Sequence, residues 1–198
     1  MKIIIDPGHG GKDHGGGSNN HWLEKDMNLK ISLYQYERLK KLGLDVELTR
    51  DKDSYLDKYE RVEKVKESKA DLCISNHINN IENPDVNGVE IIHSIYNNGV
   101  LAKHIMNELV NVGANKRRIF TKRYPNDNTK DYYYMNRLTG NVTTLIIEYG
   151  FASNKEDTKK IFQYWEEYAE AVIRSLCNYY NINYNRGGCN GKCNRRLR

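Results

Sequence analysis

The chain has 198 residues, of which 38 % are hydrophobic, 29 % are charged and only three are prolines. This is enough for one domain with a full hydrophobic core, and it excludes collagen-like and wholly disordered proteins, while no apolar run reaches the roughly 18 residues of a membrane-spanning helix. Residues 186–198 carry five of the 31 Lys and Arg and no acid, so this tail accounts for the net charge of +5.

Short apolar runs alternate with longer helical patterns, which predicts an α/β fold. The expected elements are, in chain order, a strand at 2–5, a helix at 24–42, a strand at 44–49, a helix at 56–68, strands at 71–77 and 88–93, a helix at 100–112, a strand at 143–148 and a helix at 155–180. We expect loops at 8–20, which holds six glycines, and at 113–131, which is basic and polar.

These elements predict a single three-layer domain at 1–183, with a mostly parallel, twisted sheet and helices on both faces. Residues 184–198 are expected to form a flexible, basic tail. Its Cys189 and Cys193 lack two further Cys or His ligands for zinc, because no histidine follows Cys177. The tail is therefore either a solvated segment or a contact for an anionic wall polymer.

The glycine-rich loop behind the first strand is not a phosphate-binding loop. A Walker loop needs a glycine where this chain has Asp6, and a Ser or Thr after Lys12, where it has Asp13. Asp13 also occupies the third glycine position of a dinucleotide-binding fingerprint. The distinctive member of the loop is His9, held between glycines that allow a close backbone approach to a ligand.

Polar side chains end three of the five predicted strands. His9 follows the first, His77 ends the third and Glu148 ends the fifth. If these strands are parallel neighbours, the side chains meet at the carboxyl edge of the sheet, where ligands of open α/β folds bind. Two imidazoles and a carboxylate suit one zinc ion, and Glu24, at the start of the first helix, is the candidate for a further protein ligand.

Other histidines compete for the metal. His21 and Glu24 have the H-x-x-E spacing of zinc carboxypeptidases, so they form a rival set with a later histidine. His14 lies in the glycine-rich loop, whereas His93 and His104 fall in a strand and a helix, where structural roles are favoured. The absence of H-E-x-x-H excludes the common helical metalloproteases.

Several motifs stand in a fixed order along the chain and carry a family resemblance. They are Asp6-Pro7-Gly8-His9-Gly10-Gly11, Glu24-Lys25-Asp26 with Leu29, Thr49-Arg50, Arg61, Ser75-Asn76-His77-Ile78-Asn79, Gly88-Val89-Glu90, Glu148-Tyr149-Gly150-Phe151 and Ser153-Asn154. With these motifs the chain resembles, over about residues 1–180, the zinc-dependent N-acetylmuramoyl-L-alanine amidases of bacteria and their phages.

The resemblance implies that His9, Glu24 and His77 bind one zinc ion and that Glu148 is the catalytic carboxylate. The positions of the strand ends favour the same residues. The resemblance disfavours His21 as a metal ligand. The implied reaction is hydrolysis of the amide between N-acetylmuramic acid and L-alanine in peptidoglycan, which lyses the cell wall. Glu148 would move the protons, since its apolar strand should raise its pKa toward the range that a general base needs.

Further residues have expected supporting roles. We expect Asp6 to orient His9, Asn79 to position ligand or substrate, and Arg61 to form a salt bridge. Two positions depart from the family pattern: Ile78 replaces a small residue beside the second histidine, and residues 114–118 replace an arginine-glycine segment.

Two alternatives remain for the function. One is a zinc carboxypeptidase or endopeptidase that acts on wall peptides through His21 and Glu24, and the other is a non-catalytic wall-binding protein. The expected partner is peptidoglycan, with an anionic wall polymer at the tail and no nucleic acid. The apolar run behind Met1 has three residues, whereas a secretory signal needs about 7 to 15. We therefore expect synthesis in the cytoplasm without a signal peptide, and action on the wall after lysis or release, as in an endolysin or a sporulation autolysin.

Overall fold

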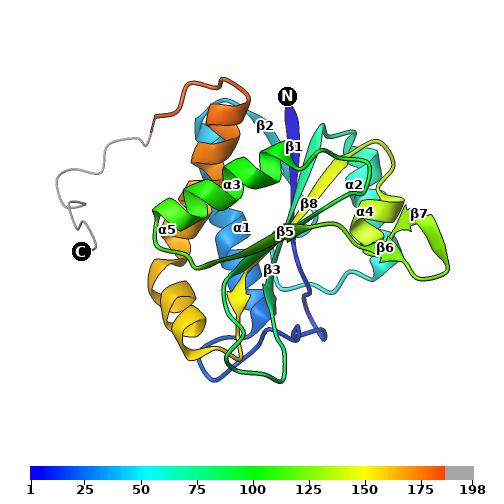
Figure 1. The fold of residues 1–198 in the computed structure, drawn as a ribbon. Coiled ribbons are helices and arrows are strands. Elements are labelled where there is room, and N and C mark those ends of the chain that lie inside the picture. The colour runs from blue at the N-terminus through cyan, green and yellow to red at the C-terminus, as the bar shows by residue number, and fades with distance from the viewer. Residues whose placement is uncertain (186–198) are drawn as a thin grey trace.

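A six-stranded sheet forms the centre of the computed structural model, which describes residues 1–185 (Figure 1). Its strands, in spatial order, are β2 (Asp45–Leu48), β1 (Lys2–Pro7), β3 (Leu72–Asn79), β8 (Thr143–Phe151), β4 (Val89–His93) and β5 (Lys116–Phe120). A separate hairpin consists of β6 (Arg123–Tyr124) and β7 (Asp127–Asp131). The predictions for Cys189, Cys193 and the basic side chains of the tail lie outside the described residues.

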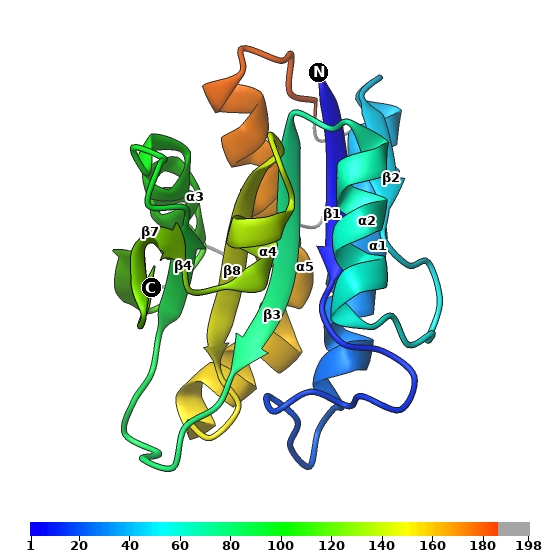
Figure 2. The ribbon, with the colours of Figure 1, turned by 90° about the vertical axis from the view of Figure 1, so that its right-hand side faces the viewer.

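Helices cover both faces of this sheet, which confirms the predicted three layers (Figure 2). One face carries α1 (Glu24–Lys41), α3 (Val100–Asn111) and α5 (Lys155–Tyr179) over the larger hydrophobic cluster. The other face carries α2 (Lys58–Ser68) and the short α4 (Tyr134–Leu138) over a smaller cluster. Within residues 1–185, no helix is long and apolar enough to cross a membrane.

The strand directions decide which side chains can meet. β1 pairs in parallel with β2 and β3, and β3 pairs in parallel with β8, so the carboxyl ends of β1, β3 and β8 share one edge. β4 runs antiparallel to β8. Only nine residues separate β3 from β4, which is too short for the crossover of a dozen or more residues that a parallel return needs.

Side chains of β8 alternate between the two faces. Leu145 and Ile147 belong to the larger cluster beneath α1, α3 and α5, whereas Ile146 belongs to the smaller cluster beneath α2 and α4. By the same alternation Thr144 and Glu148 face α2 and α4. This is the more thinly covered face, and it leaves room for a ligand beside Glu148.

The segment expected as a loop at 113–131 contains β5, β6 and β7, and α4 was not predicted either. β5 is an edge strand of sequence KRRIF with its first three side chains exposed, so it lacks the apolar alternation by which strands are found. The helix α4 has five residues, too few to show a helical period. The other predicted elements are present, with bounds that differ by a few residues.

Candidate metal centre and active site

The carboxyl edge of the sheet brings together His9, Glu24 and His77, from the end of β1, the start of α1 and the end of β3. One possible ligand atom from each lies within 4.8 Å of the others, and no other three His, Cys, Asp or Glu side chains in residues 1–185 are grouped this way. Glu24 Oε1 lies 3.2 Å from His9 Nε2 and 3.2 Å from His77 Nδ1. The carboxylate oxygen thus sits between the two rings.

Two glycines make this close grouping possible. A Cβ atom on Gly8 would lie 2.2 Å from Cε1 of the His77 ring, so any other residue would displace the imidazole. Gly15 has a φ of 83°, and a Cβ there would lie 2.4 Å from Glu24 Oε2. The glycine-rich loop therefore wraps directly around two of the three side chains.

The backbone holds Glu24 in place. Gly17 N–H donates to its Oε2 at 2.7 Å and Ile78 N–H donates to its Oε1 at 3.0 Å. Burial raises the pKa of Glu24, but His77 and His9 together hold that pKa far below its usual range. Conversely, burial lowers the pKa of His9, and its contacts with Glu24 and Asp13 raise it to about 9. Glu24 is therefore ionised at neutral pH, which is the form in which a carboxylate binds a metal ion.

The donor set fits a zinc ion. Zinc prefers imidazole nitrogen and carboxylate oxygen, and a metal-binding histidine usually gives its second ring nitrogen to an orienting group. His9 meets this condition, because its Nδ1 lies 2.8 Å from Asp13 Oδ2 while its Nε2 faces Glu24.

Glu148 lies beside the three donors on β8. It is paired with His77 across β3 and with Glu90 across β4. Its Oε2 is buried and has no hydrogen-bond partner among residues 1–185. Burial raises the pKa of Glu148 to about 7, with Glu24 and Glu90 raising it and His77 lowering it. A carboxyl group with this pKa can both accept and donate a proton near neutral pH.

Asp6 does not make the contact that we expected with the His9 ring. Its carboxylate is fully buried and accepts hydrogen bonds from the hydroxyls of Thr49 and Ser75, at 2.6 and 2.7 Å. Asp13 orients the His9 ring instead. The reason is the backbone at His9, whose φ of 60° turns the chain out of the strand and toward the loop that holds Asp13.

Two buried arginines fix the backbone around His9. Arg61 pairs with Asp6, as expected of a salt-bridge residue, and also donates to the carbonyls of Pro7 and His9, at 2.8 and 2.9 Å. Arg50 donates to the carbonyls of Pro7 and Gly8, at 3.1 and 2.9 Å. A positive φ is costly for a residue other than glycine, and these bonds hold His9 in it. Arg50 belongs to a quoted motif, but no role was predicted for it.

Asn79 acts on a neighbour of Glu148. Its Nδ2 donates to Glu90 Oε2 at 3.0 Å, and Glu90 Oε1 accepts from Arg117 and Arg118 at 2.8 and 2.6 Å. Asn79 and the two arginines thus fix the carboxylate opposite Glu148. Glu90 belongs to a quoted motif, but no role was predicted for it, although a carboxylate within an apolar strand run is a signal for one.

A cavity of about 430 Å³ opens above the donors. His9, His77 and Glu148 line it together with Tyr133 and Tyr134. We call this space the catalytic cavity. Two tyrosine side chains therefore share this space with the acid and two of the candidate metal ligands.

The rival histidines lie elsewhere. The His21 ring lies 5.6 Å from the ring of Phe162, and the His104 ring lies 5.4 Å from that of Tyr179. His93 Nδ1 bonds to the carbonyl of Ser94. None of the three belongs to the cluster around Glu24.

Comparison with known proteins gives a consistent set of relatives. Residues 3–178 match the family model described as N-acetylmuramoyl-L-alanine amidase. The uncharacterized protein YqiI of Bacillus subtilis is 30 % identical over 185 residues, which cover 90 % of this chain and 84 % of YqiI. The N-acetylmuramoyl-L-alanine amidase LytC of the same organism is also 30 % identical over 185 residues, but this chain spans only 35 % of its length.

Solved structures of amidases share the fold. The catalytic domain of the amidase CwlV from Bacillus (Paenibacillus) polymyxa var. colistinus superposes with a TM-score of 0.79 at 26 % identity, covering 92 % of this chain and 99 % of that one. The amidase AmiC2 of Nostoc punctiforme superposes with a TM-score of 0.80 at 29 % identity, covering 91 % and 97 %.

Proposed function

Because the chain belongs to the N-acetylmuramoyl-L-alanine amidase family, we propose that it is a zinc-dependent enzyme that hydrolyses the bond between N-acetylmuramic acid and L-alanine in peptidoglycan and so lyses the cell wall. The observation that carries this proposal is the grouping of His9, Glu24 and His77 beside an unpartnered carboxyl oxygen of Glu148.

His9, Glu24 and His77 would hold the metal, with Asp13 fixing the orientation of the His9 ring. When bound, zinc supplies Lewis-acid chemistry, since it polarises a carbonyl and lowers the pKa of water from about 15.7 toward about 7. The backbone N–H groups of Gly17 and Ile78 donate to the carboxylate of Glu24 and would fix its position as a ligand.

Glu148 transfers the protons in this proposal. Its carboxylate removes a proton from the water whose oxygen attacks the amide carbon. It then gives this proton to the alanine nitrogen as the carbon–nitrogen bond breaks, so that a neutral amine leaves and the carboxylate is restored. A pKa of about 7 serves both steps, because neither protonation state is strongly favoured at neutral pH.

Digestion of purified peptidoglycan tests this function. New L-alanine amino termini, lost on chelation and restored by zinc, are the expected result. Free D-alanine or other new amino termini would instead support the peptidase alternative. Binding to the wall without any cleavage, at full zinc occupancy, would support a non-catalytic wall-binding protein.

A further inference from the structure

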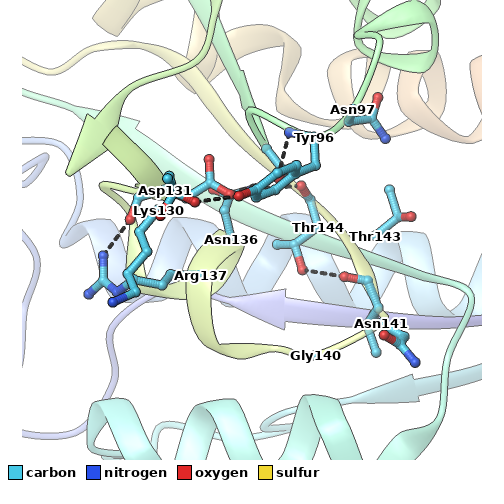
Figure 3. Close-up of a pocket in the computed structure, with 13 residues that line it drawn as sticks. Tyr96, Asn97, Lys130, Asp131, Asn136, Arg137, Gly140, Asn141, Thr143 and Thr144 are labelled. Atoms are coloured by element: carbon cyan, nitrogen blue, oxygen red, sulfur yellow. Dashed lines mark hydrogen bonds between the residues drawn. The ribbon is translucent and has the colours of Figure 1, made fainter. Parts of the chain in front are cut away.

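A second pocket, shown in Figure 3, lies near the start of β8, whereas the candidate metal ligands lie at the carboxyl edge of the sheet. It has a volume of about 310 Å³, at the lower end of the roughly 300–1,000 Å³ of small-molecule pockets. We call it the distal pocket and define it by Tyr96, Asn97, Asn136, Asn141, Thr143 and Thr144. These residues come from the loop after β4, from α4 and from the start of β8. No step of the proposed hydrolysis uses them.

Three charged residues, Lys130, Asp131 and Arg137, also line the distal pocket, and each already has a hydrogen-bond or ion-pair partner. The carboxylate of Asp131 accepts a hydrogen bond from the Ser94 hydroxyl at 2.7 Å. Arg137 Nη1 donates to the backbone carbonyl of Asp131 at 2.6 Å, and Lys130 Nζ lies 2.8 Å from a carboxylate oxygen of Asp127. A free ion would have to compete with these partners, so the pocket is better suited to a neutral ligand.

Neutral polar groups in the pocket, by contrast, lack partners. Asn136 Oδ1 is buried without a hydrogen bond, while its Nδ2 donates to the Thr144 carbonyl at 2.8 Å. The exposed Asn141 and the half-buried Thr143 make no side-chain hydrogen bond with any of residues 1–185, so both are open to solvent or a ligand. A buried acceptor without a partner is costly, and a ligand carrying hydroxyl or amide N–H groups would satisfy it.

Tyr96 adds an aromatic surface to these polar groups. Its side chain is 77 % exposed, and Figure 3 shows the ring reaching across the pocket toward Lys130 and Asp131. The phenol hydroxyl donates to the carbonyl of Thr129, which fixes the ring. An exposed, fixed ring offers an apolar face for a flat, weakly polar ligand surface, such as the C–H face of a sugar ring.

The distal pocket and the catalytic cavity lie on the same face of the sheet. Thr144 and Glu148 face the same side of β8, and four residues of strand place them about 13 Å apart. The helix α4 separates the two spaces: Tyr134 and Met135 line the catalytic cavity, and Asn136 lines the distal pocket. A chain molecule that occupied both spaces at once would have to pass around α4.

We propose that the distal pocket binds an N-acetylated hexosamine unit of a glycan strand while a peptide-bearing unit of the same strand occupies the catalytic cavity. Hydroxyl and acetamido groups match the unpartnered side chains, and the sugar ring matches the face of Tyr96. The inference rests on the proposed function, which supplies the glycan. Its consequence is a preference for long strands over a single disaccharide-peptide.

Binding is tested first, with the full chain and a peptide-free tetramer of β-1,4-linked N-acetylglucosamine as the probe. The wild type should bind the tetramer, and Tyr96→Ala and Asn141→Ala should each weaken binding on the order of tenfold. Tyr59→Ala, at a 62 % exposed tyrosine of α2 outside both spaces, is the matched control and should bind like the wild type. Absence of binding, or an unchanged affinity in Tyr96→Ala, overturns the proposal.

Inorganic phosphate serves as the second probe. If phosphate, and not the tetramer, shifts the amide resonances of Thr143 and Thr144, the pocket is an anion site and the proposal is overturned. Shifts caused by the tetramer alone support it.

Kinetic measurements then distinguish the role of the distal pocket from that of the catalytic cavity. Tyr96→Ala should raise KM for long-strand peptidoglycan about tenfold with kcat unchanged, and should leave the hydrolysis of a disaccharide-peptide as in the wild type. An equal effect on both substrates overturns the proposal. If the wild type cleaves neither substrate, the proposed function fails, while the tetramer titration still decides the role of the distal pocket.

Discussion

Replacement of Arg61 by methionine removes the partner of a fully buried carboxylate. The Arg61 side chain is 4 % exposed and the Asp6 side chain 0 %, so Asp6 would remain as a buried charge without a counter-charge. Breaking such a pair costs about 3–5 kcal/mol. The hydroxyls of Thr49 and Ser75 still donate to Asp6, so we expect a loss near the lower end, about 3 kcal/mol, from a total of about 5–15 kcal/mol for a domain.

Urea unfolding at two pH values tests the electrostatic origin of this loss. Burial raises the pKa of Asp6, but Arg61 and the two hydroxyls hold it below its usual value in the wild type. The wild type therefore gains stability from Asp6 above the unfolded pKa and loses it as the pH falls through the folded pKa. In Arg61→Met burial dominates, so the folded-state pKa of Asp6 lies above its unfolded value. Protonation of Asp6 at lower pH therefore stabilises the folded variant. The difference in stability between wild type and variant should narrow from pH 7 to pH 4, by about 1.4 kcal/mol for each pH unit by which the folded-state pKa of Asp6 in the variant exceeds 4.

Arg174→Met is the matched control. Arg174 pairs with Glu108 at 2.6 Å, but the two side chains are 24 % and 21 % exposed, so we expect a loss below about 1 kcal/mol. Equal losses in the two variants, or a gap for Arg61→Met that is the same at pH 4 and pH 7, would refute the reasoning.

Three further predictions concern the candidate active site. Glu148→Gln should abolish turnover while bound zinc, measured by atomic emission, stays at one per chain; a loss of zinc would make Glu148 a ligand. His9→Ala should lose zinc and activity and His21→Ala should keep both, and the reverse pattern would favour the peptidase alternative. Gly8→Ala should reduce zinc affinity in a competition titration, because its Cβ meets the His77 ring. Gly16→Ala is the control and should leave zinc affinity unchanged, since no atom lies within 4 Å of the new Cβ. Equal affinities in these two variants would contradict the packing argument.

Much of the fold could be predicted because its central strands are continuous apolar runs and its long helices have clear periods. The gathering of His9, His77 and Glu148 followed from one further assumption, that their strands are parallel neighbours, and the sheet order confirms it. The roles of these residues as metal ligands and proton carrier remain predictions.

Contacts between segments far apart in the chain could not be predicted from the sequence. The bond between Arg50 and the Gly8 carbonyl joins residues 42 positions apart, and nothing in the local pattern around either residue indicates it. Asp13 lies only four residues from His9, but a positive φ at a histidine, which no propensity predicts, brings them together. The strand β5 was not predicted, because an exposed edge strand does not need the apolar side chains by which strands are recognised.

Because β4 runs antiparallel to β8, the distal pocket and the candidate metal centre are built from different loops. Because β4 runs against β8, the loop that leaves it emerges at the far edge of the sheet, together with the start of β8. Residues 94–99 can therefore be exchanged for a longer or differently composed loop without touching a residue of the candidate metal centre. If the distal pocket binds a glycan unit as proposed, grafting of such loops changes the strand length that the enzyme prefers and leaves its cleavage chemistry intact.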